Sequence, residues 1–332
     1  MEIFPVQYST LSALALGERV ATVYNLPVTQ CRYLLRGVSD TYVVTTTTGQ
    51  YILKVYRDAH RSVAEINGEL ALLDALVSGG AQVVRPIANP AGERLLPLQA
   101  PEGLRYAVLF SFAAGRTLAG FSEAQLGIIG REMAFNHNIT AVVQLPWPRK
   151  AYTHQTTVER PLSLLQPAFD EYPEGYALLQ QTAARVAGKL AAYDTAKFNV
   201  GYCHYDYFPK NFFFDGEDKM TLFDFDFAGR GFLAYDLASI FIHFYFDTRY
   251  KQKPREQAKA EMDTIVAGYR QLRAISGEEL EAIPLLAYQL LLFYLGFQYE
   301  NFDDWSNFFF STRFLKARLE EMEDIASEYC NL

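Results

Sequence analysis

The sequence of 332 residues predicts an α+β protein, with a small antiparallel sheet and a helix in its N-terminal third and a larger, mainly helical remainder. Three observations predict this class: a hairpin pattern near residue 50, a capped amphipathic helix soon after it, and long helical patterns from residue 122 onward. The length suffices for two domains, and half of the residues are hydrophobic, so a sizeable core can be buried. We expect domains at 1–112 and 113–332.

The first hairpin follows from turn chemistry. A run of threonines ends at Gly49-Gln50, so residues 43–47 and 51–56 should pair as two strands, with Lys54 on the returning strand. A helix is expected before this sheet, over 10–24, and a further apolar strand over 106–112. A lone lysine on a strand usually faces solvent, so a functional role for Lys54 requires support from the neighbouring elements.

A helix begins shortly after Lys54. Ser62 and Glu65 form a capping box, and one apolar stripe continues until the glycines at 79 and 80. The stripe consists of Ile66, Leu70, Leu73 and Val77. Glu69 lies within this helix, and Glu65 lies one turn earlier on the same side. Glu65 already has a capping role.

The most specific signal is the string from His204 to Asn211, which includes Asp206 and is followed by Asp224. A hydroxyl must lose its proton as it attacks a phosphoryl group, and a carboxylate such as Asp206 can orient and accept it. Carboxylate and amide oxygens suit Mg²⁺, so Asn211 and Asp224 are candidate metal ligands. The pattern is typical of a phosphotransferase.

A second hairpin is predicted between the two candidate ligands, because residues 212–214 and 219–223 flank the turn signal Asp215-Gly216. Folding it about its centre sets Asn211 opposite residue 223 or 224, where opposed residues lie about 5 Å apart. In the alternative interpretation, Asp206 and Asn211 only cap turns and Asp224 only ends a strand.

These motifs, with the later Gly229-Arg230-Gly231 and Tyr235-Asp236-Leu237-Ala238, resemble the aminoglycoside phosphotransferase and choline kinase superfamily, whose members have a protein-kinase-like, two-lobed fold. The resemblance spans most of the chain. It implies ATP and Mg²⁺ as cofactors, with Lys54 on the phosphates and Glu69 as the partner of Lys54; Glu65 is the alternative partner if the register differs. His204 would support the loop and Asp236 would brace it. Asp226 becomes a possible second metal or acceptor contact. The stretch 35–42, which contains Ser39, would be a turn over the phosphates, although its sequence alone favours a plain hairpin loop. Backbone near Ser111 to Ala113 would contact adenine.

One position departs from the family pattern. Tyr205 stands where these enzymes usually have glycine, so its phenol could narrow the acceptor site or contact the acceptor. Further acceptor contacts are expected from the aromatic and acidic stretch 288–305, where Glu300, Asp303 and Trp305 could bind an ammonium group. The alternative is an ordinary core stripe beside a solvated acidic face.

The chain looks most like the branch called type II homoserine kinases, which predicts a small, amine-bearing acceptor with a hydroxyl group. The alternatives are an aminoglycoside-type antibiotic phosphotransferase, a bacterial stress-response serine/threonine protein kinase, and a nucleotide-binding pseudokinase that regulates a partner. The intact Lys54, Asp206, Asn211 and Asp224 argue against the pseudokinase.

Net charge and cysteine content limit the kinds of binding partner and the cellular compartment to expect. A formal charge of −8 argues against nucleic acid and is compatible with a cationic acceptor. Three widely separated cysteines, Cys31, Cys203 and Cys330, fit reduced thiols. Since we find neither a signal-peptide pattern nor an apolar stretch of bilayer length, we expect a cytoplasmic protein without a membrane partner.

Overall fold

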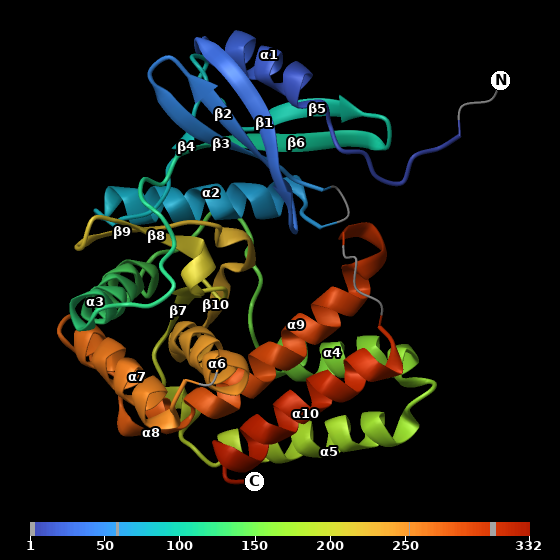
Figure 1. Cartoon of the computed structure of the whole chain (residues 1–332), viewed down its shortest axis with the longest axis vertical. Coiled ribbons are helices and arrows are strands. Elements are labelled where there is room, and N and C mark those ends of the chain that lie inside the picture. The colour runs from blue at the N-terminus through green and yellow to red at the C-terminus, as the bar shows by residue number, and fades with distance from the viewer. Residues whose placement is uncertain (1–3, 58–59, 252, 306–309) are drawn as a thin grey trace. The chain divides into compact units, whose positions relative to one another are not determined.

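The chain divides into two compact units in a computed structural model that describes residues 4–57, 60–251, 253–305 and 310–332, with side chains described outside 302–305. The first unit contains residues 1–114 and the second begins at Gly115 (Figure 1). Segments 144–148 and 221–226 also belong to the first unit.

The first unit is an antiparallel sheet with two helices. The sheet order is β1-β2-β3-β6-β4, and β5 pairs with β6. Its elements are α1 (Ala13–Tyr24), β1 (Val28–Arg36), β2 (Asp40–Thr46), β3 (Gly49–Val55), α2 (Val63–Ser78), β4 (Pro86–Ile87), β5 (Leu96–Ala100) and β6 (Gly103–Ser111). The hairpin predicted around Gly49 is β2–β3. The sequence did not reveal β1, because most of its side chains are exposed and its sequence lacks an alternating apolar pattern.

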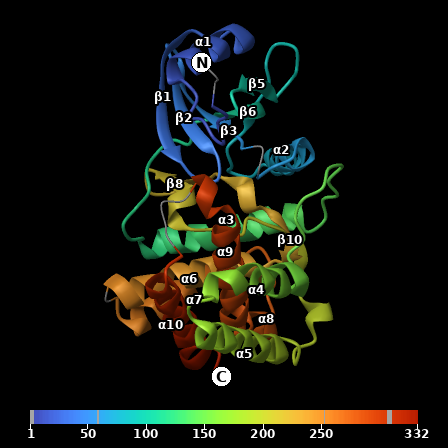
Figure 2. The same ribbon diagram turned by 90° about the vertical axis from the view of Figure 1, so that its right-hand side faces the viewer.

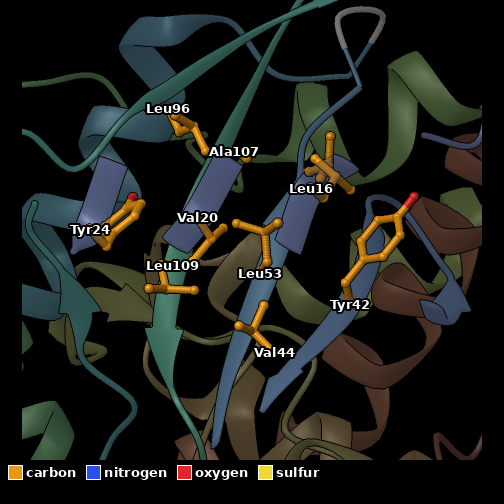
Figure 3. Close-up of a cluster of buried hydrophobic side chains, with 10 residues drawn as sticks. Leu16, Val20, Tyr24, Tyr42, Val44, Leu53, Leu96, Ala107 and Leu109 are labelled. Carbon is orange, nitrogen blue, oxygen red and sulfur yellow. The ribbon is translucent and has the colours of Figure 1, made fainter. Parts of the chain in front are cut away.

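The core of this unit lies under α1. Figure 3 shows Leu16, Val20 and Tyr24 of α1 directed at side chains of the strands. The strand members of this cluster are Tyr42, Val44, Leu53, Val55, Leu96, Ala107 and Leu109. Because side chains alternate along a strand, Leu53 and Val55 face α1 while Lys54 points to the opposite face of the sheet.

Helix α2 begins where the sequence predicts. The hydroxyl of Ser62 accepts the N–H of Glu65, and the Glu65 carboxylate accepts the N–H of Ser62, which completes the capping box. Ile66, Leu70 and Leu73 of the predicted stripe are buried. Glu69 is buried as well, with 1% of its surface exposed. A charged side chain this deep requires a partner.

The second unit is mainly helical (Figure 2). Its long helices are α3 (Glu123–Thr140), α5 (Pro173–Leu190), α6 (Ala234–Lys251), α7 (Arg255–Arg270), α9 (Ile283–Trp305) and α10 (Thr312–Glu328), and its shorter ones include α4 (Arg160–Leu165) and α8 (Gly277–Glu281). Helix α9 packs against α4, α6 and α10, and α3 packs against α7. No helix in the described ranges combines the length and apolar character that crossing a bilayer requires.

Two short strand pairs carry the loop motifs. Strand β7 (Val200–Cys203) pairs with β10 (Gly229–Phe232), and β8 (Phe212–Asp215) pairs with β9 (Lys219–Leu222). The second pair is the predicted hairpin. The string from His204 to Asn211 therefore lies between a paired strand, β7, and the start of β8.

Candidate active site

Lys54 is surrounded by carboxylates of the first unit. Its Nζ lies 3.0 Å from Asp224 Oδ1, 3.0 Å from Asp226 Oδ2 and 3.6 Å from Glu69 Oε1. The structure thus gives Lys54 the predicted partner Glu69, while Glu65 is used in the capping box. The Tyr56 hydroxyl donates to Glu69 Oε2 at 3.1 Å and fixes that carboxylate from the other side.

The charge of Lys54 is set by two opposing effects. Burial disfavours the ammonium form, but Asp224, Asp226 and Glu69 favour it more strongly, so the Lys54 pKa lies well above its usual value. The side chain is therefore a permanent cation near neutral pH. A fixed positive charge on a buried strand face is suited to binding an anionic ligand.

Asp224 has the features of a metal ligand. Its backbone is in the left-handed region, with φ of 66°, a conformation that is strained for a non-glycine residue and often found at functional sites. Its side chain is 46% exposed and contacts Lys54 through Oδ1. Oδ2 has no partner among the described residues, so an oxygen atom suited to Mg²⁺ remains available.

Asp226 occupies a different environment. Only 4% of its surface is exposed, and its Oδ2 contacts Lys54 while its Oδ1 accepts the Nε–H of Arg61 at 2.9 Å. The Ser39 hydroxyl also points at Oδ2, at 3.4 Å. Ser39 is 4% exposed, so the structure directs it to a carboxylate rather than to solvent. Sequence reasoning did not identify Arg61, although it stands directly before the N-cap of α2.

In the second unit, the loop after β7 gathers three of the predicted residues. Asn211 Nδ2 donates to Asp206 Oδ2 at 2.7 Å and to the Asp206 carbonyl at 2.8 Å. The N–H of Asp206 donates to His204 Nδ1 at 3.2 Å. Lys210 Nζ lies 3.0 Å from the same Asp206 Oδ2. Asp206 Oδ1 has no partner among the described residues, so this oxygen is available to a ligand.

The loop is anchored by Asp236 at the start of α6. Its carboxylate accepts the backbone N–H of His204 at 3.0 Å and that of Tyr205 at 2.8 Å. His137 of α3 lies 2.9 Å from the same carboxylate and 2.9 Å from the Tyr269 hydroxyl, so it is a satisfied core histidine. Asp236 braces the loop, as the resemblance implied.

Tyr205 has a backbone conformation that favours glycine. Its φ is 62°, in the left-handed region where glycine carries no steric penalty. The phenol is completely buried and stacks on Tyr152 with ring centroids 3.4 Å apart. A Cβ on Gly231 would come within 2.0 Å of the Tyr205 hydroxyl, so the Gly-x-Gly piece makes room for the ring. The side chain is packed in the core and does not face the solvent.

Aromatic side chains of α9 lie next to this loop. The Tyr294 hydroxyl donates to the Tyr205 carbonyl, and the Tyr294 ring is 6.4 Å from that of Phe208. Burial and the nearby Asp206 charge raise the Tyr294 pKa well above its usual value, so the phenol remains a donor. Lys150 Nζ sits 4.9 Å from the centre of the Phe293 ring. Sequence reasoning placed this stretch near the acceptor but did not single out Tyr294.

The other predicted contacts differ in their surroundings. Glu300 forms an ion pair with Arg160, so its charge is already compensated. Asp303 and Trp305 belong to the last turns of α9, and their side chains lie outside the described residues. Ser111 donates its N–H to the Arg85 carbonyl at 2.9 Å, so this donor is taken within the sheet. Ala113 follows β6 and is 6% exposed.

The predicted residues thus lie in two groups, one in each unit. The first unit holds Lys54, Glu69, Asp224 and Asp226, and the second holds His204, Asp206 and Asn211. The approach of Asn211 to Asp224 stays a prediction.

An antiparallel N-terminal sheet with a lysine–glutamate pair, followed by a helical unit with an Asp-x₄-Asn loop, defines the class of kinase-like phosphotransferases. Residues 30–275 match the model of the phosphotransferase enzyme family. The match covers more than half of the chain, and the chain belongs to this family. It is accordingly a kinase, an enzyme that transfers a phosphoryl group to an alcohol group.

Comparisons with individual proteins agree. A homoserine kinase of Paramagnetospirillum magneticum is 30% identical over 279 residues, which cover 81% of each chain. An amicoumacin kinase, solved with AMP-PNP, Ca²⁺ and Ami, superposes with a TM-score of 0.77 at 19% identity, covering 96% of this chain and 94% of the other. A microcompartment-associated aminopropanol kinase gives a TM-score of 0.75 at 20% identity, with 95% of each chain covered. These two structures share the fold of the chain.

Proposed function

We propose that the protein is an ATP- and Mg²⁺-dependent kinase that phosphorylates a hydroxyl group of a small, amine-bearing molecule. The single observation that carries this proposal is the loop in which Asp206 is held by Asn211 and braced through Asp236. One carboxylate oxygen is fixed by two donors while the other has no partner among the described residues. That arrangement suits a residue that must orient a hydroxyl and accept its proton.

Asp206 is assigned the proton-accepting role and His204 the support of the loop. Oδ2 of Asp206 accepts from Asn211 and lies beside Lys210, which limits rotation of the carboxylate. Oδ1 then receives the acceptor hydroxyl. The proton moves to this oxygen as the hydroxyl oxygen forms its bond to the γ-phosphorus and the bond to the β-phosphate oxygen breaks.

Lys54, oriented by Glu69, is assigned to the nucleotide phosphates, and Asn211 and Asp224 to the metal ion. The donor set fits Mg²⁺, because it consists of hard oxygens: a half-exposed carboxylate and the amide oxygen of Asn211, whose Nδ2 is already committed to Asp206. When bound, Mg²⁺ would neutralise phosphate charge. Because the Ser111 N–H is taken, the backbone of Phe112 and Ala113 is the candidate for the contact with adenine.

The acceptor class is supported by the relatives. Homoserine and aminopropanol, the acceptors in the names of two of them, each carry an amine and a hydroxyl group. Glu300 offers limited support for an ammonium site, since Arg160 already compensates its charge. Aromatic rings of α9 beside the loop could contact an ammonium group.

ADP release from Mg-ATP tests the proposal. The purified chain should release ADP only when one member of a panel is present, the panel being homoserine, aminopropanol, choline, an aminoglycoside and a serine-containing protein. No release with any member, together with no binding of AMP-PNP, would contradict a catalytic role for the loop. A hit limited to the aminoglycoside or the protein would retain the kinase and overturn the acceptor class.

The matched variants are Asp206→Asn and Asp215→Asn. Asp206→Asn removes the proton acceptor but keeps its shape, and should lower kcat about 10²- to 10⁴-fold. Asp215 is an exposed aspartate at the end of β8 in the same part of the chain, so its variant should keep full turnover. Equal rates for the two variants would show that the role of Asp206 is wrongly assigned.

A further inference from the structure

We propose that Asp226 is a positioning residue and not a metal ligand, and that it forms with Arg61 a fixed counter-ion pair that sets the position of Lys54. The inference rests on the proposed function, because Lys54 and Asp224 act there on nucleotide and metal. It assigns a role to Arg61, which no sequence motif singled out. It also assigns different roles to the two aspartates of the segment 224–226: Asp224 binds the metal ion and Asp226 positions Lys54.

The two aspartates differ in exposure and in the use of their oxygens. The side chain of Asp224 is 46% exposed and touches one cation, Lys54, through one oxygen. The side chain of Asp226 is 4% exposed, and each of its oxygens contacts a different cation, Arg61 at Oδ1 and Lys54 at Oδ2. A metal ion on Asp226 would have to displace or share an oxygen with a fixed, buried cation.

Arg61 is well placed to hold Asp226. Its Nε donates to Asp226 Oδ1 at 2.9 Å, and its second terminal nitrogen donates to the Asp226 backbone carbonyl at 3.0 Å. The remaining terminal nitrogen donates to the His60 carbonyl at 2.9 Å, which fixes the guanidinium plane. Two nitrogen donors of the planar Arg61 guanidinium thus bind the same residue, Asp226, in a geometry that a lysine cannot reproduce.

The pair connects helix α2 with the segment 224–226, the two elements whose carboxylates contact Lys54. Arg61 directly precedes Ser62, the N-cap of α2, and α2 carries Glu69. Asp226 belongs to the segment that carries Asp224. Lys54 Nζ lies 3.0 Å from Asp226 and 3.6 Å from Glu69. The ammonium therefore lies between the segment 224–226 and helix α2, which the Arg61–Asp226 pair connects.

Charge balance supports this division of roles. The described group contains two cations, Lys54 and Arg61, and three carboxylates, Glu69, Asp224 and Asp226. Asp226 is the member that contacts both cations, so its charge is the most fully compensated. A divalent ion bound there would stand next to two positive groups, whereas at Asp224 it would stand next to one. The exposed carboxylate is therefore the better metal ligand.

Divalent-ion binding separates the roles without any turnover. Free Mn²⁺ is measured by electron paramagnetic resonance during titration of the full chain, with AMP-PNP at a concentration that saturates each variant. Asp224→Asn should weaken Mn²⁺ binding by at least tenfold, while Asp226→Asn should stay within about threefold of the parent. An equal loss for both variants overturns the inference. If the parent chain itself binds neither AMP-PNP nor Mn²⁺, it is the proposed function that fails.

Arg61 variants test the counter-ion pair. Arg61→Gln removes one of the two described cations in contact with Asp226, which should lower the Tm by about 5 to 10 °C and weaken AMP-PNP binding about 3- to 30-fold. The double variant Arg61→Gln with Asp226→Asn removes both charges, so its Tm should fall by less than the sum of the two single changes. Additive losses, or an Arg61→Gln chain with parental AMP-PNP affinity, would overturn the pairing.

Discussion

Tyr205 offers a sharp test of how backbone conformation acts next to Asp206, the proposed proton acceptor. Its φ of 62° is strained for any residue with a Cβ, and its ring is completely buried against Tyr152. The strain is tolerated because the ring packs over Gly231 and because Asp236 accepts the Tyr205 N–H. The perturbation that separates strain from packing is the pair Tyr205→Ala and Tyr205→Gly.

Both variants lose the ring, at a cost of about 3 to 5 kcal/mol in unfolding free energy. Alanine keeps the left-handed strain, roughly 1 to 2 kcal/mol, whereas glycine releases it. Glycine also gives the unfolded chain more conformational freedom, which lowers the unfolding free energy of the glycine variant by about 0.5 to 1 kcal/mol. The glycine variant should therefore be the more stable of the two by about 0.5 to 1 kcal/mol, or roughly 1 to 4 °C in Tm.

The assay is thermal unfolding followed by calorimetry, with Tyr207→Ala and Tyr207→Gly as the control pair. Tyr207 is equally buried and has an ordinary, negative φ, so alanine should be the better replacement there. The expected result is an inversion of the alanine–glycine order between positions 205 and 207. If alanine is as good as or better than glycine at both positions, the reasoning about strain at Tyr205 is refuted.

Two further predictions concern α9 and α6. Tyr294→Phe removes the donor to the Tyr205 carbonyl, so the unfolding free energy should fall by about 1 to 3 kcal/mol. The variant should also lose more in kcat than it changes in KM. An unchanged kcat would argue against a role for this hydrogen bond. Burial lowers the pKa of His243 despite the nearby Asp247, so folding favours the neutral ring. The unfolded chain takes up the proton first, and this contribution to stability is present above pH 6.5 and lost as the pH falls. Between about pH 7 and pH 5, the Tm of the His243→Gln variant should therefore fall less than the Tm of the parent chain. Parallel curves of Tm against pH for the two proteins would count against this explanation.

Local sequence signals predicted the elements that local interactions define. The capping box of α2 uses atoms three residues apart, and the β2–β3 and β8–β9 hairpins follow from turn residues between short strands. The loop string from His204 to Asn211 was readable because its chemistry lies within eight consecutive residues. Strand β1 was missed because its side chains are mostly exposed, so burial imposes no alternating pattern on its sequence.

The sequence by itself determined the class of the protein, the loop that carries Asp206 and the helix that carries Glu69. Only the tertiary structure decided which charges meet. Arg61 reaches Asp226 across 165 positions, Arg160 compensates Glu300 across 140, and Tyr294 donates to Tyr205 across 89. No local pattern records such pairs, since any arginine or tyrosine that the fold brings near would satisfy the same oxygen. The left-handed backbone at Tyr205 and Asp224 likewise depends on packing and anchoring from distant residues, because neither side chain prefers that conformation alone.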